Sequence, residues 1–319
     1  MKKIKIAIVG ASGLVGQKIL QVLYEEGVYE NAVVTLFVSK KSSGKVCYFK
    51  GECLRLVELD EMQASKKFDI VFMSAGEEVS LRYAKIFAGA GAFVIDNTNA
   101  FRKICPLIVP EINQSKIAVD EKIISNPNCS TIELAIVIQK LLQVCDIEKI
   151  VVSTYQSVSG AGKEAVFDLE NGTNNFFKKG IKNNVIAKIG ELDENGNSTE
   201  ENKIMFELNK ILESNIQIIA TAVRVPVLYC HGESAYVQFK HAMDFEKITQ
   251  TLSSENLELS TDICLNREIA DTNKTIVCRL RKVSENEIAF FIMADNLRRG
   301  AAYNAVKISQ NIIKNLMKN

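Results

Sequence analysis

The feature that most constrains the fold of this chain is a glycine-rich turn between an expected strand and an expected helix. Residues 3–9 alternate and then run apolar, as buried parallel strands do, and residues 14–26 show helical periodicity. Glycines in such a turn let the backbone approach a pyrophosphate, and the helix N-terminus attracts its charge. We therefore predict an α/β chain with a Rossmann-type dinucleotide-binding domain. The expected cofactor-binding turn consists of Gly10, Ala11, Ser12, Gly13, Leu14, Val15 and Gly16.

The expected second strand, residues 32–38, ends without the acidic residue that usually reads the ribose hydroxyl of NAD. The residues that follow carry hydroxyl and ammonium groups, which suit the 2′-phosphate of NADP. We therefore predict NADP as the cofactor, with Ser39, Lys41 and Ser42 among its contacts. The alternative interpretation is a solvated, lysine-rich loop.

Further apolar segments are expected to complete this sheet, with a helix over residues 79–90. A polar loop that contains Arg102 follows one of these segments, at the edge where ligands bind in parallel sheets. Arg102 either holds an oxyanion there with its bidentate guanidinium or is simply solvated. The expected strands are residues 69–73, 92–96, 106–111 and 122–124.

A second turn, residues 125–129, leads into an apolar helical run and presents a cysteine. Proline at position 127 pushes its predecessor out of the helical region, and Asn128 is a good N-cap for the helix. Cys129 then falls on the first helical turn, where unpaired amides and the helix dipole favour a thiolate. The turn therefore suggests a nucleophile. A small buried cysteine at a helix start is the alternative.

The remaining chain predicts a second, sheet-rich α+β domain with a mixed sheet. An antiparallel pair is expected over residues 275–282 and 287–294, and a long helix over residues 296–317. Residues 172–184 are rich in Asn, Gly and Lys and are expected to be irregular. The other expected strands are residues 147–154, 216–223 and 234–240, and the other expected helices are residues 131–142, 200–212 and 244–252.

Composition excludes several classes of protein. The net charge of +1 gives no sign of a nucleic-acid-binding face, and no segment is long and apolar enough for a membrane span. The eight cysteines include no CxxC pair, which argues against a metal site or a disulfide framework and for a reduced, cytoplasmic protein. The two histidines are His231 and His241, and we expect His231 to be the base because His241 follows a strand end.

A nicotinamide cofactor together with a thiolate at a helix start suggests one reaction type. The thiolate adds to an aldehyde, hydride passes to NADP, and an acceptor attacks the resulting thioester. The Cys129 amide and the Asn128 side chain are candidates to stabilise the oxyanion, and His231 is the candidate base.

Six motifs make the chain resemble the aspartate-semialdehyde dehydrogenase family over essentially its whole length. The Asn-Cys-Ser turn and the spacing of seven between Arg224 and His231 are its most specific features. The six motifs are Gly-Ala-Ser-Gly-Leu-Val-Gly at 10–16, Ser-Asn-Pro-Asn-Cys-Ser-Thr at 125–131, Tyr-Gln-Ser-Val-Ser-Gly-Ala-Gly at 155–162, Glu-Glu-Asn-Lys-Ile-Met at 200–205, Arg-Val-Pro-Val-Leu-Tyr-Cys-His at 224–231 and Asn-Leu-Arg-Arg-Gly-Ala-Ala at 296–302.

The resemblance implies a role for each matching residue. Cys129 would be the acyl-thioester nucleophile, His231 the acid/base and Gln156 the residue that orients the substrate. Arg224 would pair with the substrate carboxylate, and Glu200 with its ammonium group. The implied phosphate site consists of Arg102, Lys203 and Asn99, and the further cofactor contacts that we expect are Ser159, Gly160 and Asn296. The family usually has arginine where this chain has Lys41.

The resemblance also implies the overall function. The expected reaction is the NADP-dependent, reversible reductive dephosphorylation of L-4-aspartyl phosphate to L-aspartate 4-semialdehyde and phosphate, in lysine (diaminopimelate), methionine, threonine and isoleucine biosynthesis. The expected assembly is a homodimer or homotetramer. The NADP-binding domain is expected to be discontinuous, residues 1–128 plus 296–319, with residues 129–295 as the catalytic and dimerisation domain.

Three competing functions share parts of this pattern. N-acetyl-glutamyl-phosphate reductases typically read Asn-Pro-Gly-Cys-Tyr at the nucleophile, whereas this chain has Asn128 before the cysteine and Ser130 after it. A catalytically dead binding protein would lose the nucleophile, which is present here. A reductase that uses coenzyme A on a related semialdehyde is the third alternative, and phosphate dependence distinguishes it.

Overall fold

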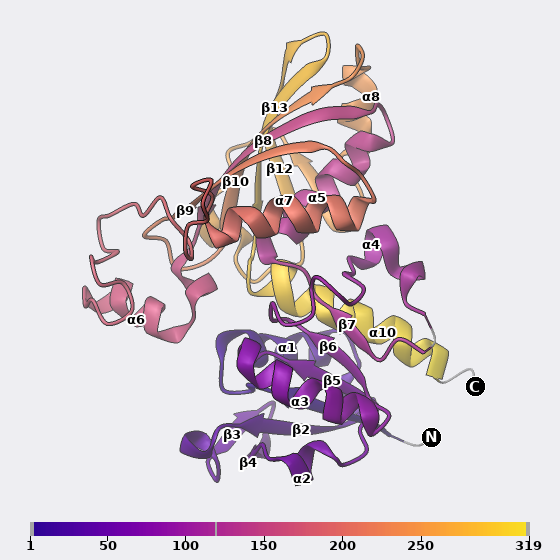
Figure 1. Ribbon diagram of the computed structural model, residues 1–319, viewed down its shortest axis with the longest axis vertical. Coiled ribbons are helices and arrows are strands. Elements are labelled where there is room, and N and C mark those ends of the chain that lie inside the picture. Colours follow the sequence, from indigo (N-terminus) through magenta and orange to yellow (C-terminus); the bar gives the residue numbers. More distant parts are fainter. Residues whose placement is uncertain (1–2, 119, 317–319) are drawn as a thin grey trace. The chain divides into compact units, whose positions relative to one another are not determined.

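The computed structural model describes residues 3–118 and 120–316, and the chain divides into two compact units (Figure 1). The first unit comprises the residues up to Pro127 and those from Ala301 onward, and the second unit comprises Asn128–Gly300. The first unit is thus discontinuous. The segment 296–300, which we expected in the first unit, belongs to the second.

The first unit is built on a seven-stranded sheet that is parallel except at one edge, where β3 runs antiparallel to β4. Its strands in spatial order are β3 (Val46–Phe49), β4 (Glu52–Glu58), β2 (Ala32–Val38), β1 (Ile4–Val9), β5 (Ile70–Met73), β6 (Phe93–Asp96) and β7 (Ile123–Ser125). The predicted Rossmann-type domain is confirmed.

Helices cover both faces of this sheet, which explains why β1 is apolar along its length. Ile6 and Ile8 of β1 share one core with α1 (Leu14–Glu25) and α10 (Asn304–Leu316). Ala7 and Val9 point to the other face and share a second core with α2 and α3. The shorter elements of this unit are η1 (Tyr29–Asn31), η2 (Lys40–Ser42), α2 (Glu61–Ala64), α3 (Glu77–Gly89), α4 (Pro110–Asn113) and η3 (Gln114–Lys116).

Two expectations for the first unit are wrong. Residues 106–111 do not form a strand, because only Leu107 makes an isolated bridge, to Ser125, before the chain turns into α4 at Pro110. Proline fixes its own φ and suits the first turn of a helix. The β3–β4 hairpin was not expected. Its strands are short, and its turn is Lys50-Gly51, which takes positive φ angles but is not one of the Asn-Gly or Asp-Gly pairs that signal a hairpin.

The second unit is built on a six-stranded mixed sheet, as predicted. The β8–β9 and β11–β12 pairs are parallel, and the other neighbours are antiparallel. The strands in spatial order are β11 (Leu257–Ser260), β12 (Thr275–Ser284), β13 (Glu287–Ala294), β10 (His231–Phe239), β8 (Ile147–Gln156) and β9 (Gln217–Arg224).

Helices α5 (Cys129–Leu142) and α7 (Thr199–Leu212) pack against this sheet, and α8 (Phe245–Thr251) packs against α5 (Figure 1). Side chains alternate along β8 and β9, so one face is buried while Tyr155 and Ile219 on the other are 42% and 47% exposed. The remaining elements are η4 (Val158–Ala161), α6 (Lys163–Asn171) and α9 (Asn266–Ile269).

The expected helix over residues 296–317 is shorter than predicted. Its regular part, α10, begins only at Asn304, and a wide π-helical turn (η5) occupies Arg298–Tyr303. The Asp295 carboxylate accepts hydrogen bonds from the backbone amides of Leu297 and Arg298, which holds the chain in a turn before the helix. Met317 lies outside the described residues. None of the described helices combines the length and the apolar character that a membrane crossing requires.

Candidate active site

Helix α5 begins at Cys129, as predicted, and Asn128 is its N-cap. The Asn128 side-chain oxygen accepts a hydrogen bond of 3.2 Å from the Thr131 amide, which is the bond expected of a capping residue. The Asn128 amide group donates to Glu200 at 2.7 Å, and its backbone N–H donates to Glu207 at 2.7 Å. These bonds join the start of α5 to α7, and the expected contact of Asn128 with an oxyanion stays a prediction.

The environment of Cys129 does not favour a thiolate in the way the helix terminus alone suggests. Desolvation raises the pKa of the Cys129 thiol, and the nearby carboxylates of Glu200 and Glu133 raise it further. The guanidinium of Arg224 and the Ser130 amide lower it, but by less. Cys129 is therefore a protonated thiol in the resting protein.

Gln156 and Glu200 form a buried polar pair close to Cys129. The Gln156 amide donates to the Ser130 hydroxyl at 3.1 Å and to Glu200 at 3.2 Å. Lys203 Nζ also forms an ion pair with the Glu200 carboxylate, at 3.1 Å. Burial would raise the pKa of Glu200, but Lys203 and the amides of Asn128 and Gln156 outweigh it and lower that pKa. Glu200 is therefore a buried carboxylate anion, suited to binding an ammonium group.

Arg224 ends β9 and His231 begins β10, and both contact Ser157. Arg224 donates to the Ser157 carbonyl at 2.7 Å, and the Ser157 amide donates to His231 Nδ1 at 3.1 Å. Burial, aided by the charge of Arg224, lowers the pKa of His231 to about 3. Because Nδ1 accepts the Ser157 N–H, the neutral ring carries its proton on Nε2. Within the described residues, Nε2 makes no hydrogen bond.

Gly160 has no side chain, and the side chains of Arg224 and His231 both border the space beside it. A β-carbon at position 160 would lie 3.1 Å from Nη1 of Arg224 and 3.3 Å from Nε2 of His231. Two of the predicted site residues therefore meet at one point, and the absence of a side chain at Gly160 keeps that point accessible. The earlier expectation of a cofactor contact for Gly160 stays a prediction.

Asn296 and Ser159 form hydrogen bonds with the segments that carry Ser157 and His231. The Asn296 side-chain oxygen accepts hydrogen bonds from the Ser157 hydroxyl at 3.0 Å, the Ser159 hydroxyl at 3.2 Å and the Cys230 amide at 3.1 Å. Both Asn296 and Ser159 are 2% exposed. These hydrogen bonds hold the segment that positions His231. The sequence analysis did not single out Ser157, because the resemblance assigns no role to this residue within the motif at 155–162. Cofactor contacts of Asn296 and Ser159 stay predictions.

Arg102 and Asn99, two of the three expected phosphate ligands, lie in the first unit. Arg102 is buried and donates from Nε to the Asn126 carbonyl at 3.1 Å and from Nη2 to the Asn97 carbonyl at 3.1 Å. Asn99 is exposed. Because Lys203 belongs to the second unit, the phosphate site that these three residues would share stays a prediction.

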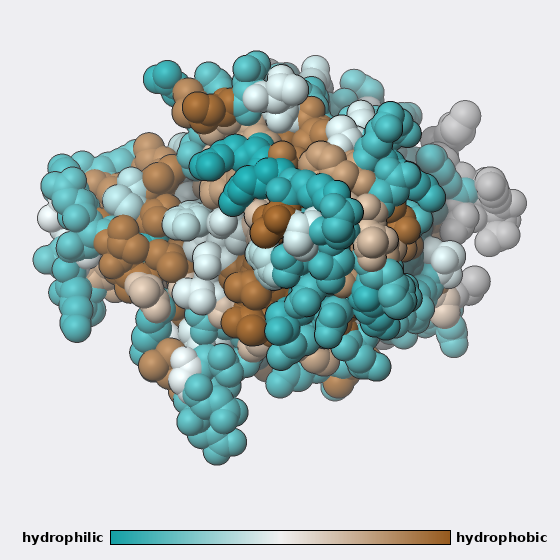
Figure 2. Space-filling model, turned by 90° about the horizontal axis from the view of Figure 1, so that it is seen from above, coloured by the Kyte–Doolittle hydropathy of each residue, from teal (hydrophilic) through white to brown (hydrophobic). Residues whose placement is uncertain are grey.

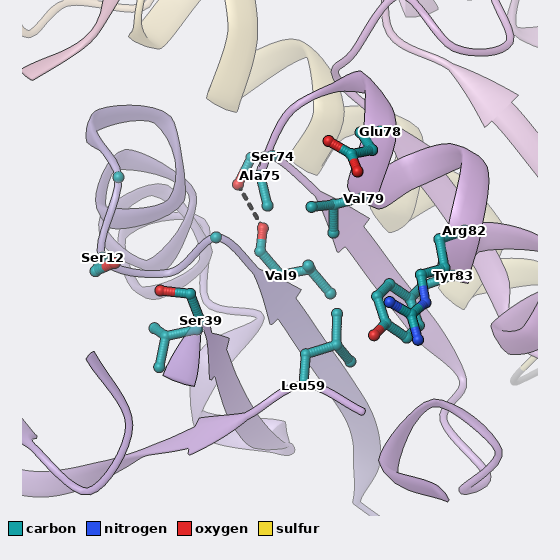
Figure 3. Close-up of a pocket in the computed structure, with 13 residues that line it drawn as sticks. Val9, Ser12, Ser39, Leu59, Ser74, Ala75, Glu78, Val79, Arg82 and Tyr83 are labelled. Carbon is teal, nitrogen blue, oxygen red and sulfur yellow. Dashed lines mark hydrogen bonds between the residues drawn. The ribbon is translucent and has the colours of Figure 1, made fainter. Parts of the chain in front are cut away.

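A cavity of about 530 Å³ lies in the first unit at the glycine-rich turn (Figure 3). Gly10 has a φ of +83°, and a β-carbon there would lie 2.7 Å from the Ser74 backbone, so glycine is needed. A β-carbon at Gly16 would collide with the Gly10 carbonyl oxygen, so Gly16 allows the start of α1 to pack closely on the turn.

Four of the expected cofactor residues line this cavity: Gly10, Ser12, Gly13 and Ser39. Lys41 and Ser42 follow Ser39 in η2 and are not among the lining residues; Lys41 is exposed. The structure adds the last residues of β1 and β2, residues that directly follow β4 and β5, and residues of α3. The strand ends come to the same edge as the turn because these strands are parallel (Figure 3). The added lining residues are Val9, Val38, Leu59, Ser74, Ala75, Glu78, Val79, Arg82 and Tyr83.

Comparison with known proteins identifies a family for each of the two units. Residues 5–119 match the family described as "Semialdehyde dehydrogenase, NAD binding domain", and residues 138–299 match "Semialdehyde dehydrogenase, dimerisation domain". The aspartate-semialdehyde dehydrogenase of Campylobacter jejuni is 39% identical, and alignment covers 97% of each chain. That of Aquifex aeolicus is 36% identical, over 97% of this chain and 98% of the relative.

A solved structure shows the same fold. The crystal structure of aspartate semialdehyde dehydrogenase II from Vibrio cholerae, complexed with ASA, superposes with a TM-score of 0.93 at 35% identity. It covers 98% of this chain and 99% of the Vibrio chain. Identity at this level over nearly the whole chain, on the same two-domain fold, shows that the chain belongs to the aspartate-semialdehyde dehydrogenase family, oxidoreductases that act on an aldehyde.

Proposed function

We propose that the protein catalyses the NADP-dependent, reversible conversion of L-4-aspartyl phosphate to L-aspartate 4-semialdehyde and phosphate through a thioester on Cys129. The observation that carries this proposal is the position of Cys129 at the start of α5, where the charges of Glu200 and Arg224 act on its thiol. An anionic and a cationic side chain beside one nucleophile suit a substrate that is an amino acid.

The first step forms the thioester. The Cys129 sulfur attacks the acyl carbon of aspartyl phosphate, the C–S bond forms, and the C–O bond to phosphate breaks with its electron pair going to phosphate. Because Cys129 is a protonated thiol, its proton must leave in this step. The departing phosphate is basic enough to carry that proton away.

The second step releases the aldehyde. Gly10 and Gly13 would hold the dinucleotide, which would supply the hydride. As charge develops on the thioester oxygen, the Nε2–H of neutral His231 would donate a hydrogen bond to it. The C–S bond then breaks, the aldehyde leaves, and the sulfur regains a proton. In the reverse direction the Cys129 thiol gives that proton to water as its sulfur adds to the aldehyde, and the Nε2–H of His231 again donates a hydrogen bond to the developing oxyanion.

Two residues account for recognition of the amino-acid part. Glu200, a buried anion, would bind the substrate ammonium, and Arg224 would bind the α-carboxylate with its planar guanidinium. Gln156, hydrogen-bonded to Glu200 and Ser130, would orient the acyl group near the sulfur.

The cavity in the first unit fits a dinucleotide, and the end of β2 favours NADP over NAD. Ser39 lines the cavity at that position and no acidic side chain follows β2 there to repel a 2′-phosphate. Gly10 and Gly13 would lie against the pyrophosphate. Arg82, on α3, adds a cation to the same cavity.

The remaining parts of the proposal concern assembly and context. The exposed face of the second sheet, with Tyr155 and Ile219, supports a homodimer or a homotetramer built on that face. The eight free cysteines suit a reducing, cytoplasmic compartment. The enzyme would serve amino-acid biosynthesis, on the branches to lysine by diaminopimelate, methionine, threonine and isoleucine.

A steady-state assay tests the proposal. Reduction of NADP with aspartate semialdehyde should require phosphate or arsenate, should be faster than with NAD at equal concentrations, and should not respond to coenzyme A. Cys129→Ala should abolish turnover and leave the circular-dichroism spectrum unchanged. Turnover that coenzyme A supports without phosphate, or that survives in Cys129→Ala, would contradict the assignment.

A further inference from the structure

Two buried glutamates lie behind Cys129 and take no part in the proposed reaction. Glu133 is one helical turn after Cys129 on α5, and Glu233 is two residues after His231 on β10. Both side chains are 0% exposed. Within the described chain, none of their four carboxyl oxygens makes a hydrogen bond of acceptable geometry. Buried carboxyl groups without such partners are costly, so they call for an explanation.

Gly300 shows how close Glu133 comes to the nucleophile. A β-carbon at position 300 would lie 2.8 Å from Cβ of Cys129 and 3.0 Å from Oε1 of Glu133. The Glu133 carboxyl and the β-carbon of Cys129 therefore both lie against the same side of Gly300, where a side chain would stand. A charge on Glu133 acts on the sulfur over a short distance, through protein and not through water.

The charged groups around Glu133 come from every element packed against it. Glu233 faces it from β10, Asp295 from the end of β13 and Arg299 from η5, while Cys230 and Cys129 are the nearby thiols. Asp295 is held by backbone amides, among them those of Leu297 and Arg298. Glu133 is thus surrounded by two further acids and one guanidinium, and a negative charge on it is unfavourable in this buried site.

The two glutamates are consequently protonated near neutral pH. Burial raises the pKa of Glu133 well above its usual range, and the neighbouring acids raise it further, against the effect of Arg299. Burial also raises the pKa of Glu233 to about 8, although the nearby Ser130 hydroxyl lowers it somewhat. Ser130 in turn accepts a hydrogen bond from Gln156, which links Glu233 to the polar pair beside Cys129.

We propose that Glu133 and Glu233 form a buried acid pair that holds its protons at neutral pH and, on losing one as the pH rises, places a negative charge behind Cys129 that opposes thiolate formation. The proposal rests on the proposed role of Cys129 as the nucleophile. Glu133 and Glu233 touch neither substrate nor cofactor in it. They act through Cys129, so the pair limits the reactivity of the sulfur at alkaline pH.

The groups that face Cys129 set the direction of the effect. Glu200 on α7 and Glu133 on α5 raise the pKa of the thiol, and Arg224 on β9 lowers it. Glu200 is already ionised because Lys203 and two amides stabilise its charge, so its effect is constant with pH. Glu133 and Glu233 are the members that gain charge above neutral pH, and they alone make the effect depend on pH.

The rate of Cys129 alkylation by iodoacetamide measures how the reactivity of the sulfur depends on pH. The rate constant is obtained for the full chain between about pH 6 and pH 10 by mass spectrometry of the Cys129 peptide, since the chain has eight cysteines. Glu133→Gln preserves size and removes the acid nearest Cys129, and the double variant Glu133→Gln/Glu233→Gln removes both ionisable groups. Glu148→Gln, at an exposed position on β8, is the matched control.

The quantity to compare is the alkylation rate constant of each variant divided by that of wild type at the same pH. Below about pH 7 both Gln variants should react within about twofold of wild type. Above about pH 8.5 they should react about tenfold faster, which corresponds to one pKa unit at the thiol, while the control stays at wild type. A ratio that does not change with pH in both variants would overturn the acid pair.

This outcome is distinguishable from failure of the proposed function. If wild-type Cys129 is labelled in step with loss of turnover but the ratio is flat, the nucleophile stands and the acid pair falls. If complete labelling of Cys129 leaves turnover intact, the proposed function falls. The two variants also protect against misfolding of either one, because both are expected to shift the ratio in the same direction.

Discussion

At the scale of single residues, the reactivity of Cys129 depends more on its neighbours than on its place at a helix start. The sequence predicts the cap and the helix correctly, because both are local. The ionisation state is not local, because Glu200 and Arg224 reach the sulfur from α7 and β9. Glu133 did carry a local signal, since it is an acid in an otherwise apolar run one turn after Cys129.

His231 tests the same dependence on neighbours for the developing oxyanion. His231→Asn should lower kcat by about 10²–10³-fold, the usual cost of removing one donor to an oxyanion, with little change in KM. His241→Asn, at an exposed position, is the control and should leave kcat unchanged. A change confined to KM would make His231 a binding residue.

The pH dependence of the wild-type enzyme gives a second check on His231. Burial and Arg224 lower the pKa of His231 from 6.5 to about 3, so the ring is neutral above that pH. The kcat profile should therefore show no limb near pH 6.5 that belongs to this residue. An acid limb there that disappears in His231→Asn would contradict the neutral, Nε2-protonated ring.

At the scale of elements, the sequence predicts those whose apolar pattern is strong and misses those that depend on partners. Strands β1 and β5 and the second half of β2 are buried on both faces and form apolar runs, so their predicted positions agree with the structure. The β3–β4 hairpin lies at the sheet edge, where Leu56 is the one buried residue of its two strands, so its sequence lacks such a run. The π-helical turn before α10 depends on Asp295, which periodicity does not detect.

The irregular segment after α6 is organised by one carboxylate. Asp168 accepts hydrogen bonds from the Thr173 hydroxyl and from the backbone amides of Asn175, Phe176 and Phe177. Burial would raise the pKa of Asp168, but these bonds lower it to about 2. The pKa is lower in the folded state, so this stabilisation is present above about pH 4 and is lost as the pH falls toward 2.

Asp168→Asn should loosen that segment at neutral pH, because an amide cannot accept all four bonds and turns a donor toward other donors. We expect faster limited proteolysis within residues 172–180 and a lower Tm than wild type at pH 7, with the difference disappearing near pH 2. Glu170→Gln, exposed on the same helix, is the control. Equal proteolysis rates for Asp168→Asn and wild type would show that the carboxylate does not organise the loop.

At the scale of the whole molecule, the surface carries apolar patches among hydrophilic residues, as one face shows (Figure 2). Helices α5 and α7 pack against the sheet of the second unit. Tyr155 on its other face stacks on Phe291, with ring centroids 6.0 Å apart, and remains 42% exposed. An aromatic and aliphatic sheet face of this kind is suited to association with a second copy.

Placing a charge on that face tests association. Ile219→Lys should yield a smaller species than wild type in sedimentation velocity, because a buried ammonium without a partner disfavours the interface. Val33→Lys serves as the control, since Val33 is 51% exposed on β2 of the first unit, similar to the 47% of Ile219. If Ile219→Lys sediments like wild type, the interface lies elsewhere.

The discontinuity of the first unit has a consequence for the order in which the chain folds during synthesis. The face of β1 that carries Ile6 and Ile8 is covered by α1 and by α10, and α10 is synthesised after the whole of the second unit. The second unit, Asn128–Gly300, is already complete when α10 emerges. Part of the first core therefore waits, uncovered, while the later-encoded unit folds, and the nascent chain exposes an apolar surface that chaperones recognise.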